Sequence, residues 1–463
     1  MAGFLRCISA PFKRAFCFIC CWLASNTQRD TIETVFVHVP MRFCAALMLN
    51  SSLHYHNDML HCDHVPIGEI IAQVGTPVYI YSLRRAVENL KRIRAAFAAL
   101  NPHIHYSVKA NGNLSVLKGL IRAGAGIDAV SAGEIHRALI AGAGPQEIVF
   151  AGVGKTPYEI AYALEQKIGW FNVENAGECA LINDIVRHMQ LAPARVALRF
   201  NPDIPASTHP YIATGHGGAK FGLSGETVHD ILLNQADYPH VHIAGIHVHI
   251  GSQLHDTEAT RKAVALALAL IAPYPDIRTV NVGGGLPVAY GPDEIVPALD
   301  DFAAALAPLL RGYHVLLEPG RAVIADAGIL VANVIYVKQQ AGQTFYITDA
   351  SMAELIRPAL YQARHAIVPV MRAGSKTVIK PANVVGPVCE TADVLGWDVP
   401  LPEMSPGEPL AILTAGAYGM VMASNYNARP RPPEIVVNED GHTWHVARRR
   451  ETWEDLLRLE VNL

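Results

Sequence analysis

The stretch HYSVKAN, residues 105–111, is an alternating apolar run that ends in one lysine, Lys109. Small, turn-forming residues follow directly, so we expect a β-strand that delivers Lys109 to its carboxyl end. A lysine there can reach into a pocket beyond the strand, although most lysines in proteins are solvated surface charges. A chemical role for Lys109 therefore depends on what stands at the ends of the neighbouring strands.

Short apolar strands alternate with alanine- and leucine-rich helical stretches around this lysine. Eight strand candidates, the number in a (β/α)8 barrel, lie at residues 103–109, 125–130, 147–151, 169–173, 195–200, 242–250, 279–282 and 314–318. Amphipathic helices are expected at residues 84–100, 131–141, 175–187 and 257–271. We therefore predict an α/β fold whose main domain is a (β/α)8 TIM-type barrel over residues 81–321.

The alternation stops after residue 321, where irregular β-type segments with Pro and Gly punctuation begin. These segments are residues 328–338, 343–349, 382–389, 409–414 and 433–437, and a helical end follows at 452–459. They predict a C-terminal β-domain over residues 322–463, of the sandwich or barrel-like kind. The β-type residues 51–80 are expected to join and complete it.

Residues 1–50 form an extension, which we expect to be disordered. Residues 1–29 contain no Asp or Glu and run apolar from 15 to 24, which resembles a targeting segment. No clean small-residue cleavage site follows, and this favours a dispensable extension or an upstream start. Cys17, Cys20 and Cys21 lack the second ligand pair that a zinc site needs.

Composition narrows the choice of partners. The chain has 463 residues, 51% of them hydrophobic, and a formal net charge of −4, so it has no basic footprint for nucleic acid and no polybasic membrane patch. Five of its eight cysteines lie in the first 44 residues, and the others are too scattered for a disulfide framework. We expect a cytoplasmic protein whose partners are small molecules.

Chemically capable residues follow several predicted strands at their carboxyl ends, where barrel enzymes carry their active sites. They are Lys109, Asp128, Asn201, His249, Ser252, Gly283, Gly284, Gly285, Glu318 and Arg321. Three consecutive glycines allow the backbone to approach an anion closely, although an ordinary turn explains them equally well. Glu318 is either a functional carboxylate or the ion-pair partner of Arg321.

Two kinds of site remain open at this point. His247 and His249 share one face of a strand, which admits a metal hydrolase, but Asn201 and Lys109 would complete a poor ligand set. A lysine that can form a Schiff base, a phosphate cradle, a flat stacking ring and an acid for a pyridinium proton are together what pyridoxal phosphate (PLP) requires. We favour PLP and predict no metal. The histidines at 54, 56, 61 and 64 are interpreted as surface imidazoles rather than a metal site.

Several motifs, in order along the chain, resemble the fold-type-III PLP-dependent decarboxylases, and within them the diaminopimelate decarboxylases. The motifs are YSVKAN (106–111), GAGIDAVSAGEI (124–135), FAGVGKT (150–156), HVHIGSQ (247–253), VGGGL (282–286), EPGR (318–321), IRPALY (356–361), GPVCE (386–390) and GAYGMVMASNYN (416–427). The resemblance covers the chain from about residue 55 to its end. It implies PLP-dependent conversion of meso-2,6-diaminopimelate to L-lysine and CO2, the last step of lysine biosynthesis.

The resemblance also implies roles for individual residues. Lys109 would carry the PLP, His249 would stack on its ring, and Glu318 would face its pyridine nitrogen. Ser252, Gly284, Gly285 and Tyr418 would hold the phosphate, and Asp128 also belongs to the cofactor site.

For the substrate, the resemblance implies that Arg321, Arg357 and Tyr361 bind the distal carboxylate, with Tyr418 nearby. Glu390 would take the distal ammonium and Cys389 would donate a proton, both from the other subunit of a homodimer. The implied catalytic residues are thus Lys109, His249 and Cys389.

Two other activities remain as alternatives. A sister decarboxylase of ornithine, arginine or carboxynorspermidine would have no use for Arg357 and Tyr361 if its substrate lacks a distal carboxylate. A non-catalytic PLP-binding homologue would be expected to have lost Lys109 or the Cys389–Glu390 pair, and all three residues are present.

Overall fold

The computed structural model describes residues 48–205, 209, 212, 214–372, 374 and 377–461. The interpretation of residues 1–47 as a disordered or targeting extension lies outside this range. Within the described residues, no helix has both the length and the apolar character needed to cross a membrane.

Eight parallel strands close into a barrel in the order β10-β11-β12-β5-β6-β7-β8-β9. They are β5 (His103–Ser107), β6 (Gly126–Ala129), β7 (Ile148–Phe150), β8 (Trp170–Val173), β9 (Ala194–Phe200), β10 (Val241–Val248), β11 (Thr279–Asn281) and β12 (His314–Leu317). Every residue of β6 and β8 is buried, because parallel barrel strands are covered on both faces. Each strand overlaps a predicted one, and the TIM-type barrel is therefore confirmed.

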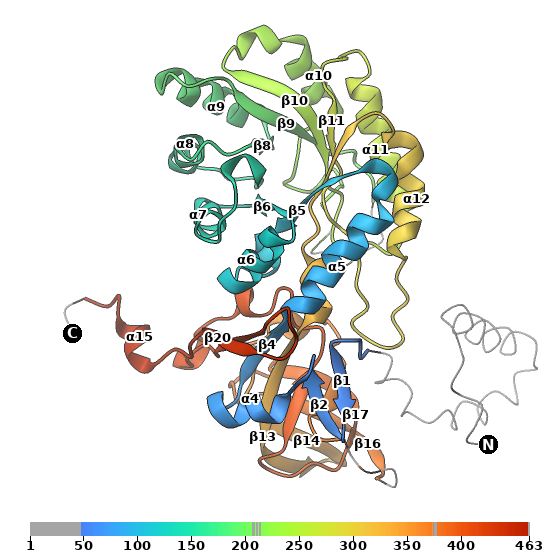
Figure 1. The fold of residues 1–463 in the computed structure, drawn as a ribbon, viewed down its shortest axis with the longest axis vertical. Coiled ribbons are helices and arrows are strands. Elements are labelled where there is room, and N and C mark those ends of the chain that lie inside the picture. Colours follow the sequence, from blue (N-terminus) through green and yellow to red (C-terminus); the bar gives the residue numbers. More distant parts are fainter. Residues whose placement is uncertain are drawn as a thin grey trace, which may run out of the picture. The chain divides into compact units, whose positions relative to one another are not determined.

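Helices alternate with these strands and lie outside the barrel (Figure 1). The larger ones are α5 (Leu83–Ala96), α6 (Leu114–Arg122), α7 (Ala132–Ile140), α8 (Pro157–Glu165), α9 (Ala176–His188), α10 (Gly225–Leu233), α11 (Glu258–Ile271) and α12 (Leu299–Leu310). Ser82, Ser131 and Asn175 cap α5, α7 and α9 by accepting from the backbone N–H three residues ahead. The polar residue just before each of these helices therefore fixes where it starts.

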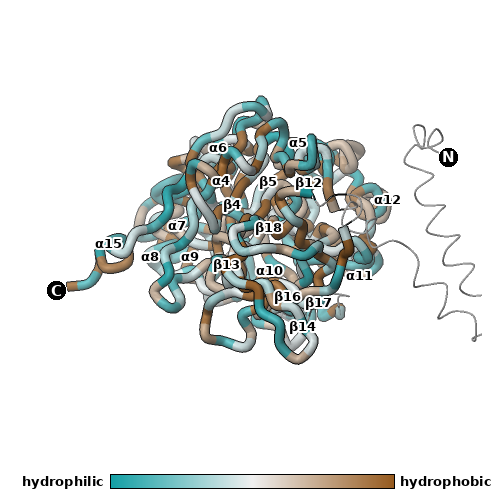
Figure 2. The backbone as a smooth tube through the Cα atoms, turned by 90° about the horizontal axis from the view of Figure 1, so that it is seen from below, coloured by the Kyte–Doolittle hydropathy of each residue, from teal (hydrophilic) through white to brown (hydrophobic). Residues whose placement is uncertain are grey.

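A second sheet follows the barrel, in the order β17-β16-β14-β13-β4-β19-β20, with β15 and β18 attached to it. Its strands are β4 (Val78–Ser82), β13 (Gly328–Gln340), β14 (Gln343–Thr348), β15 (Ile367–Pro369), β16 (Ile379–Val385), β17 (Val394–Pro402), β18 (Pro409–Ile412), β19 (Glu434–Val437) and β20 (Trp444–Arg448). The hydrophobic residues of β18 are buried in the β-domain, and Figure 2 shows the hydropathy along the chain.

Three of these strands, β15, β17 and β20, lie outside the predicted segments. β15 has only three residues, and β17 carries Gly396, Asp398 and two prolines, which ordinarily indicate a turn. β20 has only five residues, and none of them is buried. The predicted helical end is α15 (Trp453–Leu457), shorter than the predicted 452–459.

The segment before the barrel completes the β-domain, as predicted, because β4 pairs antiparallel with β13 and parallel with β19. The residues ahead of it form a separate small sheet of β1 (Leu53–His56), β2 (Met59–Cys62) and β3 (Val65–Pro66), followed by α4 (Ile67–Val74). The Leu60 N–H donates to the Val370 carbonyl at 2.8 Å, so this small sheet also packs on the β-domain. The limits predicted for the individual domains stay predictions.

Candidate active site

Lys109 lies in a short 3-10 turn, Val108–Ala110, directly after β5. Its Nζ donates to Asp128 Oδ2 at 2.9 Å, and the Ser107 hydroxyl donates to the same oxygen at 2.6 Å. Asp128 is fully buried in β6, and its Oδ1 has no partner among the described residues. Burial lowers the pKa of Lys109, but the charges of Asp128, Tyr418 and Glu318 together raise it by more, so the net shift is upward. The amine is thus held at the barrel mouth by a buried carboxylate.

Glu318 follows β12 and is surrounded by donors from other strands. Its Oε1 accepts from the Asn172 and Asn281 amides at 3.0 and 2.5 Å, and its Oε2 lies 3.4 Å from His247 Nε2. Burial raises the pKa of Glu318, but His247, Lys109 and Asn281 lower it more, and the net direction is downward. Glu318 is therefore an ionised carboxylate. It does not pair with Arg321, which was the alternative interpretation from the sequence.

The glycine run after β11 packs tightly against the neighbouring strand ends. A Cβ at Gly284 would lie 2.5 Å from the Glu318 carbonyl oxygen, and one at Gly285 would lie 2.8 Å from the Gly251 carbonyl oxygen. The Gly284 N–H donates to His249 Nδ1 at 3.3 Å. Only glycine fits this close approach of three backbones.

His249 is neutral. Burial and the positive charges of Arg199 and Lys109 hold its pKa well below the ordinary value. Because Nδ1 accepts a hydrogen bond, the ring proton lies on Nε2. The ring stacks with that of His247 at a centroid distance of 6.5 Å. A flat, uncharged ring therefore stands next to the glycine run.

Tyr418 comes from the β-domain but lies at the barrel mouth. Its N–H donates to the Ala110 carbonyl at 2.8 Å, and the Asn111 amide donates to the Gly416 carbonyl at 3.0 Å. Tyr418 has a left-handed backbone with φ of 56°, which a bulky residue rarely adopts outside a constrained site. The β-domain is thus joined to the turn that carries Lys109.

Arg321 and Arg357 are both buried, and no Asp or Glu of the described residues is among the main causes of the pKa shift of either guanidinium. Arg321 donates to Ser252 Oγ from Nε at 3.3 Å and from Nη2 at 3.1 Å, and its guanidinium lies 4.8 Å from the Tyr418 ring centroid. Tyr361, at the end of α14 (Arg357–Tyr361), acts electrostatically on both guanidinium groups. Two buried like charges without an acidic counter-ion form a site that is ready to bind an anion.

Cys389 and Glu390 lie elsewhere in the described chain, on the exposed connection between β16 and β17. Glu390 accepts from the Tyr426 hydroxyl at 2.5 Å, and Cys389 Sγ donates to Asn427 Oδ1 at 3.7 Å. Their hydrogen-bond partners are thus residues of the β-domain, and not the residues around Lys109.

Asn172, Asn281, Tyr290 and His365 join the site although none is among the predicted site residues. Asn172 stands inside the otherwise apolar strand β8, and Asn281 is the last residue of the short buried strand β11; a buried amide in a strand is the signal that marks them. Tyr290 and His365 lie in connecting segments, where no sequence pattern distinguishes them.

The described residues contain no group of three or more His, Cys, Asp or Glu side chains that could hold a metal ion. Near the small sheet the rings of His54 and His61 stack with centroids 6.0 Å apart, and His61 is buried, so its interpretation as a surface imidazole is wrong. His64 stacks on His442 at 4.3 Å.

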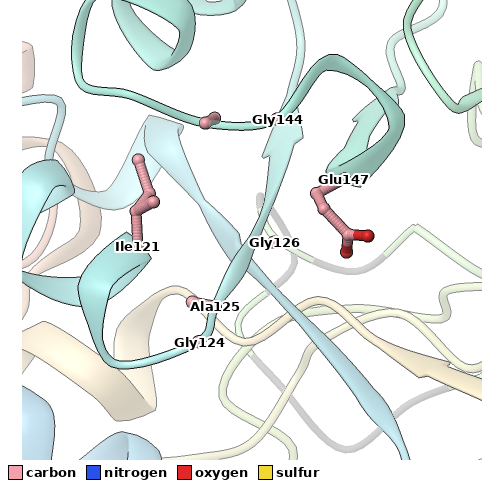
Figure 3. Close-up of a pocket in the computed structure, with 7 residues that line it drawn as sticks. Ile121, Gly124, Ala125, Gly126, Gly144 and Glu147 are labelled. Carbon is pink, nitrogen blue, oxygen red and sulfur yellow. The ribbon is translucent and has the colours of Figure 1, made fainter.

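A cavity of about 200 Å³ lies at the opposite, amino end of the barrel strands. Figure 3 shows Gly126, at the start of β6, between Ile121 and Glu147. None of the predicted site residues lines this cavity, which agrees with the general placement of active sites at the carboxyl ends of barrel strands.

The donor set at the carboxyl ends fits pyridoxal phosphate. It offers a lysine amine, an ionised buried carboxylate, a neutral flat ring and a glycine run that admits no side chain. These are the groups that a Schiff base, a protonated pyridine, ring stacking and a bound phosphate need.

Comparison with known proteins gives a consistent result. Residues 83–325 match the family "Pyridoxal-dependent decarboxylase, pyridoxal binding domain". The chain is 40% identical to the diaminopimelate decarboxylase of Aquifex aeolicus over 89% of this chain and 98% of that protein. It is 42% identical to that of Vibrio cholerae over 88% and 98%, respectively.

A solved structure agrees with these relatives. The crystal structure of diaminopimelate decarboxylase from Helicobacter pylori, complexed with L-lysine, matches with a TM-score of 0.80 and 40% identity, and the match covers 85% of this chain and 99% of that one. Because the match runs through both the barrel and the β-domain at this level of identity, the chain belongs to the diaminopimelate decarboxylases, a family of pyridoxal-dependent decarboxylases.

Proposed function

We propose that the chain decarboxylates meso-2,6-diaminopimelate to L-lysine and CO2, using pyridoxal phosphate bound at Lys109. The observation that carries the choice of substrate is the pair of buried arginines, Arg321 and Arg357, without an acidic counter-ion. Diaminopimelate is an amino acid at both ends, so its distal carboxylate can supply the missing negative charge.

The cofactor end of the site is proposed as follows. Lys109 would hold pyridoxal phosphate covalently, with Asp128 beside the amine, His249 against the ring and Glu318 at the pyridine nitrogen. Ser252, Gly284, Gly285 and Tyr418 would bind the phosphate. When bound, pyridoxal phosphate supplies an electron sink for the pair of electrons left by the departing CO2. Asn172 and Asn281 keep Glu318 oriented and ionised through their amide hydrogen bonds.

The substrate end is proposed to bind the distal amino acid. Arg321, Arg357 and Tyr361 would bind its carboxylate, Tyr418 would contact the substrate, and Glu390 would accept its ammonium. Cys389 would donate a proton to Cα after CO2 leaves the D-configured end. These contacts orient the substrate so that only one of its two carboxylates lies at the reacting end.

We also propose a homodimer with shared active sites, in which Cys389 and Glu390 come from the partner subunit. Support comes from their exposed position and from their hydrogen bonds to Tyr426 and Asn427 rather than to barrel residues. A cytoplasmic location stays a prediction, supported by the free thiols of Cys62, Cys179 and Cys389.

Mixed dimers test the sharing. Lys109→Ala and Glu390→Ala chains are each expected to be nearly inactive, but an equal mixture should regain about a quarter of wild-type activity, because half of the dimers then hold one intact site. Lys109→Ala mixed with Arg357→Leu is the matched control. It should regain nothing, because one chain supplies both Lys109 and Arg357 to a site, and each site of the mixed dimer therefore carries one of the two changes. If the first mixture stays inactive, the sites are not shared.

The substrate is tested by incubating the purified protein and added pyridoxal phosphate with meso-diaminopimelate, and in parallel with ornithine and arginine. Lysine and CO2 are expected from the first, because the arginine pair requires a distal carboxylate. Formation of a diamine from ornithine, without lysine from meso-diaminopimelate, would identify the sister decarboxylase instead.

A further inference from the structure

Two residues outside the proposed substrate contacts hold the arginine pair. Tyr290, in the segment between β11 and α12, and His365, between α14 and β15, are both buried. Tyr290 accepts from Arg321 Nη1 at 2.5 Å, while its ring lies 4.0 Å from the Arg357 guanidinium. His365 Nε2 lies 2.9 Å from Arg357 Nη1. Each guanidinium is therefore held by a neutral group.

The tautomer of His365 follows from its second contact. His365 Nδ1 lies 2.9 Å from the Leu413 carbonyl oxygen, which can only accept, so Nδ1 carries the proton. Nε2 is then a lone-pair acceptor for Arg357. Burial and the charge of Arg357 lower the pKa of His365 to about 3, and the ring remains a neutral acceptor at physiological pH.

Tyr290 connects the two parts of the site. Its carbonyl accepts from the Ala366 N–H at 3.1 Å, and its ring meets that of His365 edge-on at a centroid distance of 5.0 Å. Its N–H donates to Glu294 at 2.8 Å, which holds it on the barrel side. One phenol thus contacts the arginine of the barrel and the arginine of the β-domain together.

Neutral partners have a specific consequence for an anion site. An acid at either position would neutralise a guanidinium and compete with the ligand, whereas a hydroxyl, an imidazole lone pair and an aromatic face orient the group and leave its charge available. Holding two like charges side by side is unfavourable in the free protein, and a bound carboxylate relieves that repulsion.

We propose that Tyr290 and His365 are positioning residues that set the specificity for the distal carboxylate, by holding Arg321 and Arg357 in register without neutralising them. This inference rests on the proposed function, because it takes the arginine pair as the site for that carboxylate. It adds a requirement for neutrality around the pair, which an acidic substitution would break.

The test compares Tyr290→Phe, His365→Glu and His365→Gln with the wild type, in the PLP-loaded enzyme. Tyr290→Phe and His365→Glu should each raise KM for meso-diaminopimelate about tenfold with little change in kcat. His365→Gln keeps a neutral acceptor and should stay within about threefold of wild type. Tyr346→Phe is the matched control, because it removes a buried phenol that donates to the Pro402 carbonyl in the β-domain.

A second readout does not need turnover. Calorimetric titration with glutarate, a dicarboxylate two carbons shorter than diaminopimelate, should show the same loss of affinity in Tyr290→Phe and His365→Glu, while the visible absorbance of bound pyridoxal phosphate stays unchanged. Unaltered KM and glutarate affinity in these two variants would overturn the inference. So would a parallel fall in kcat, cofactor absorbance and affinity, which indicates a purely structural role.

The two proposals fail in different ways. If the wild type forms no lysine from meso-diaminopimelate, the proposed function is wrong, and the glutarate titration still decides whether Tyr290 and His365 position the arginine pair. If His365→Glu does not fold, Tyr290→Phe and His365→Gln decide the question.

Discussion

Lys109→Ala is expected to lower kcat/KM for meso-diaminopimelate by about 10⁴-fold or more, because it removes the amine proposed to hold the cofactor covalently. The variant should also lose the visible absorbance of pyridoxal phosphate held by the protein. Activity and absorbance spectra of the purified variant, measured with excess cofactor, check both results.

Lys109→Arg separates the chemistry of the amine from its charge. Arginine can keep the ion pair with Asp128, now 2.9 Å from Lys109 Nζ, but cannot take the place of the amine. We therefore expect it to be as inactive as Lys109→Ala while folding like the wild type. Lys118→Ala, which removes an exposed lysine on α6, should be fully active. Substantial turnover in Lys109→Arg would contradict the proposed role.

Arg357→Leu is expected to lower kcat/KM for meso-diaminopimelate about 100-fold or more, chiefly through KM, because a buried charge that pairs with the substrate carboxylate is lost. Arg357 has no acidic partner among the described residues, so no buried carboxylate is left unpaired by the change. Steady-state kinetics with meso-diaminopimelate, together with the cofactor absorbance, measure the effect.

The control for this prediction is Arg372→Leu, which removes an arginine that packs 4.3 Å from the Tyr55 ring, in a cation–π contact away from the proposed site. It should leave KM unchanged. If Arg357→Leu keeps a wild-type KM for meso-diaminopimelate, the distal carboxylate binds elsewhere, and the argument for the substrate fails with it.

The barrel could be predicted closely because its signals are local. The strands are short and largely apolar, and several helices begin at a polar cap, as α7 does at Ser131 and α9 at Asn175, so neighbouring residues carry the information. β17 and β20 could not be predicted in this way. Their pairing with β16 and β19 compensates for prolines, a glycine and solvent-facing residues that locally disfavour a strand.

The residues of the candidate site likewise fall into those that local sequence signals predict and those that they do not. Lys109, His249, the glycine run and Glu318 could be predicted because each follows a strand, and the carboxyl ends of parallel strands converge. Only the resemblance to a family pointed to Arg357, Tyr361, Cys389 and Glu390. No general rule says where a β-domain carries its functional residues, as one does for the strand ends of a barrel. Their roles stay proposals.

The sequence by itself determined the barrel, the residues at its strand ends and hence the amine, acid and ring proposed for one cofactor site, because backbone periodicity and strand direction are local properties. Only the tertiary structure decided what surrounds each charge. The amides of Asn172 and Asn281 meet at Glu318 from two other strands, and Tyr290 and His365 meet at Arg357 from two different segments. A buried charge takes its partners from wherever the chain brings a donor or acceptor within about 3 Å, and separation along the sequence does not limit that choice.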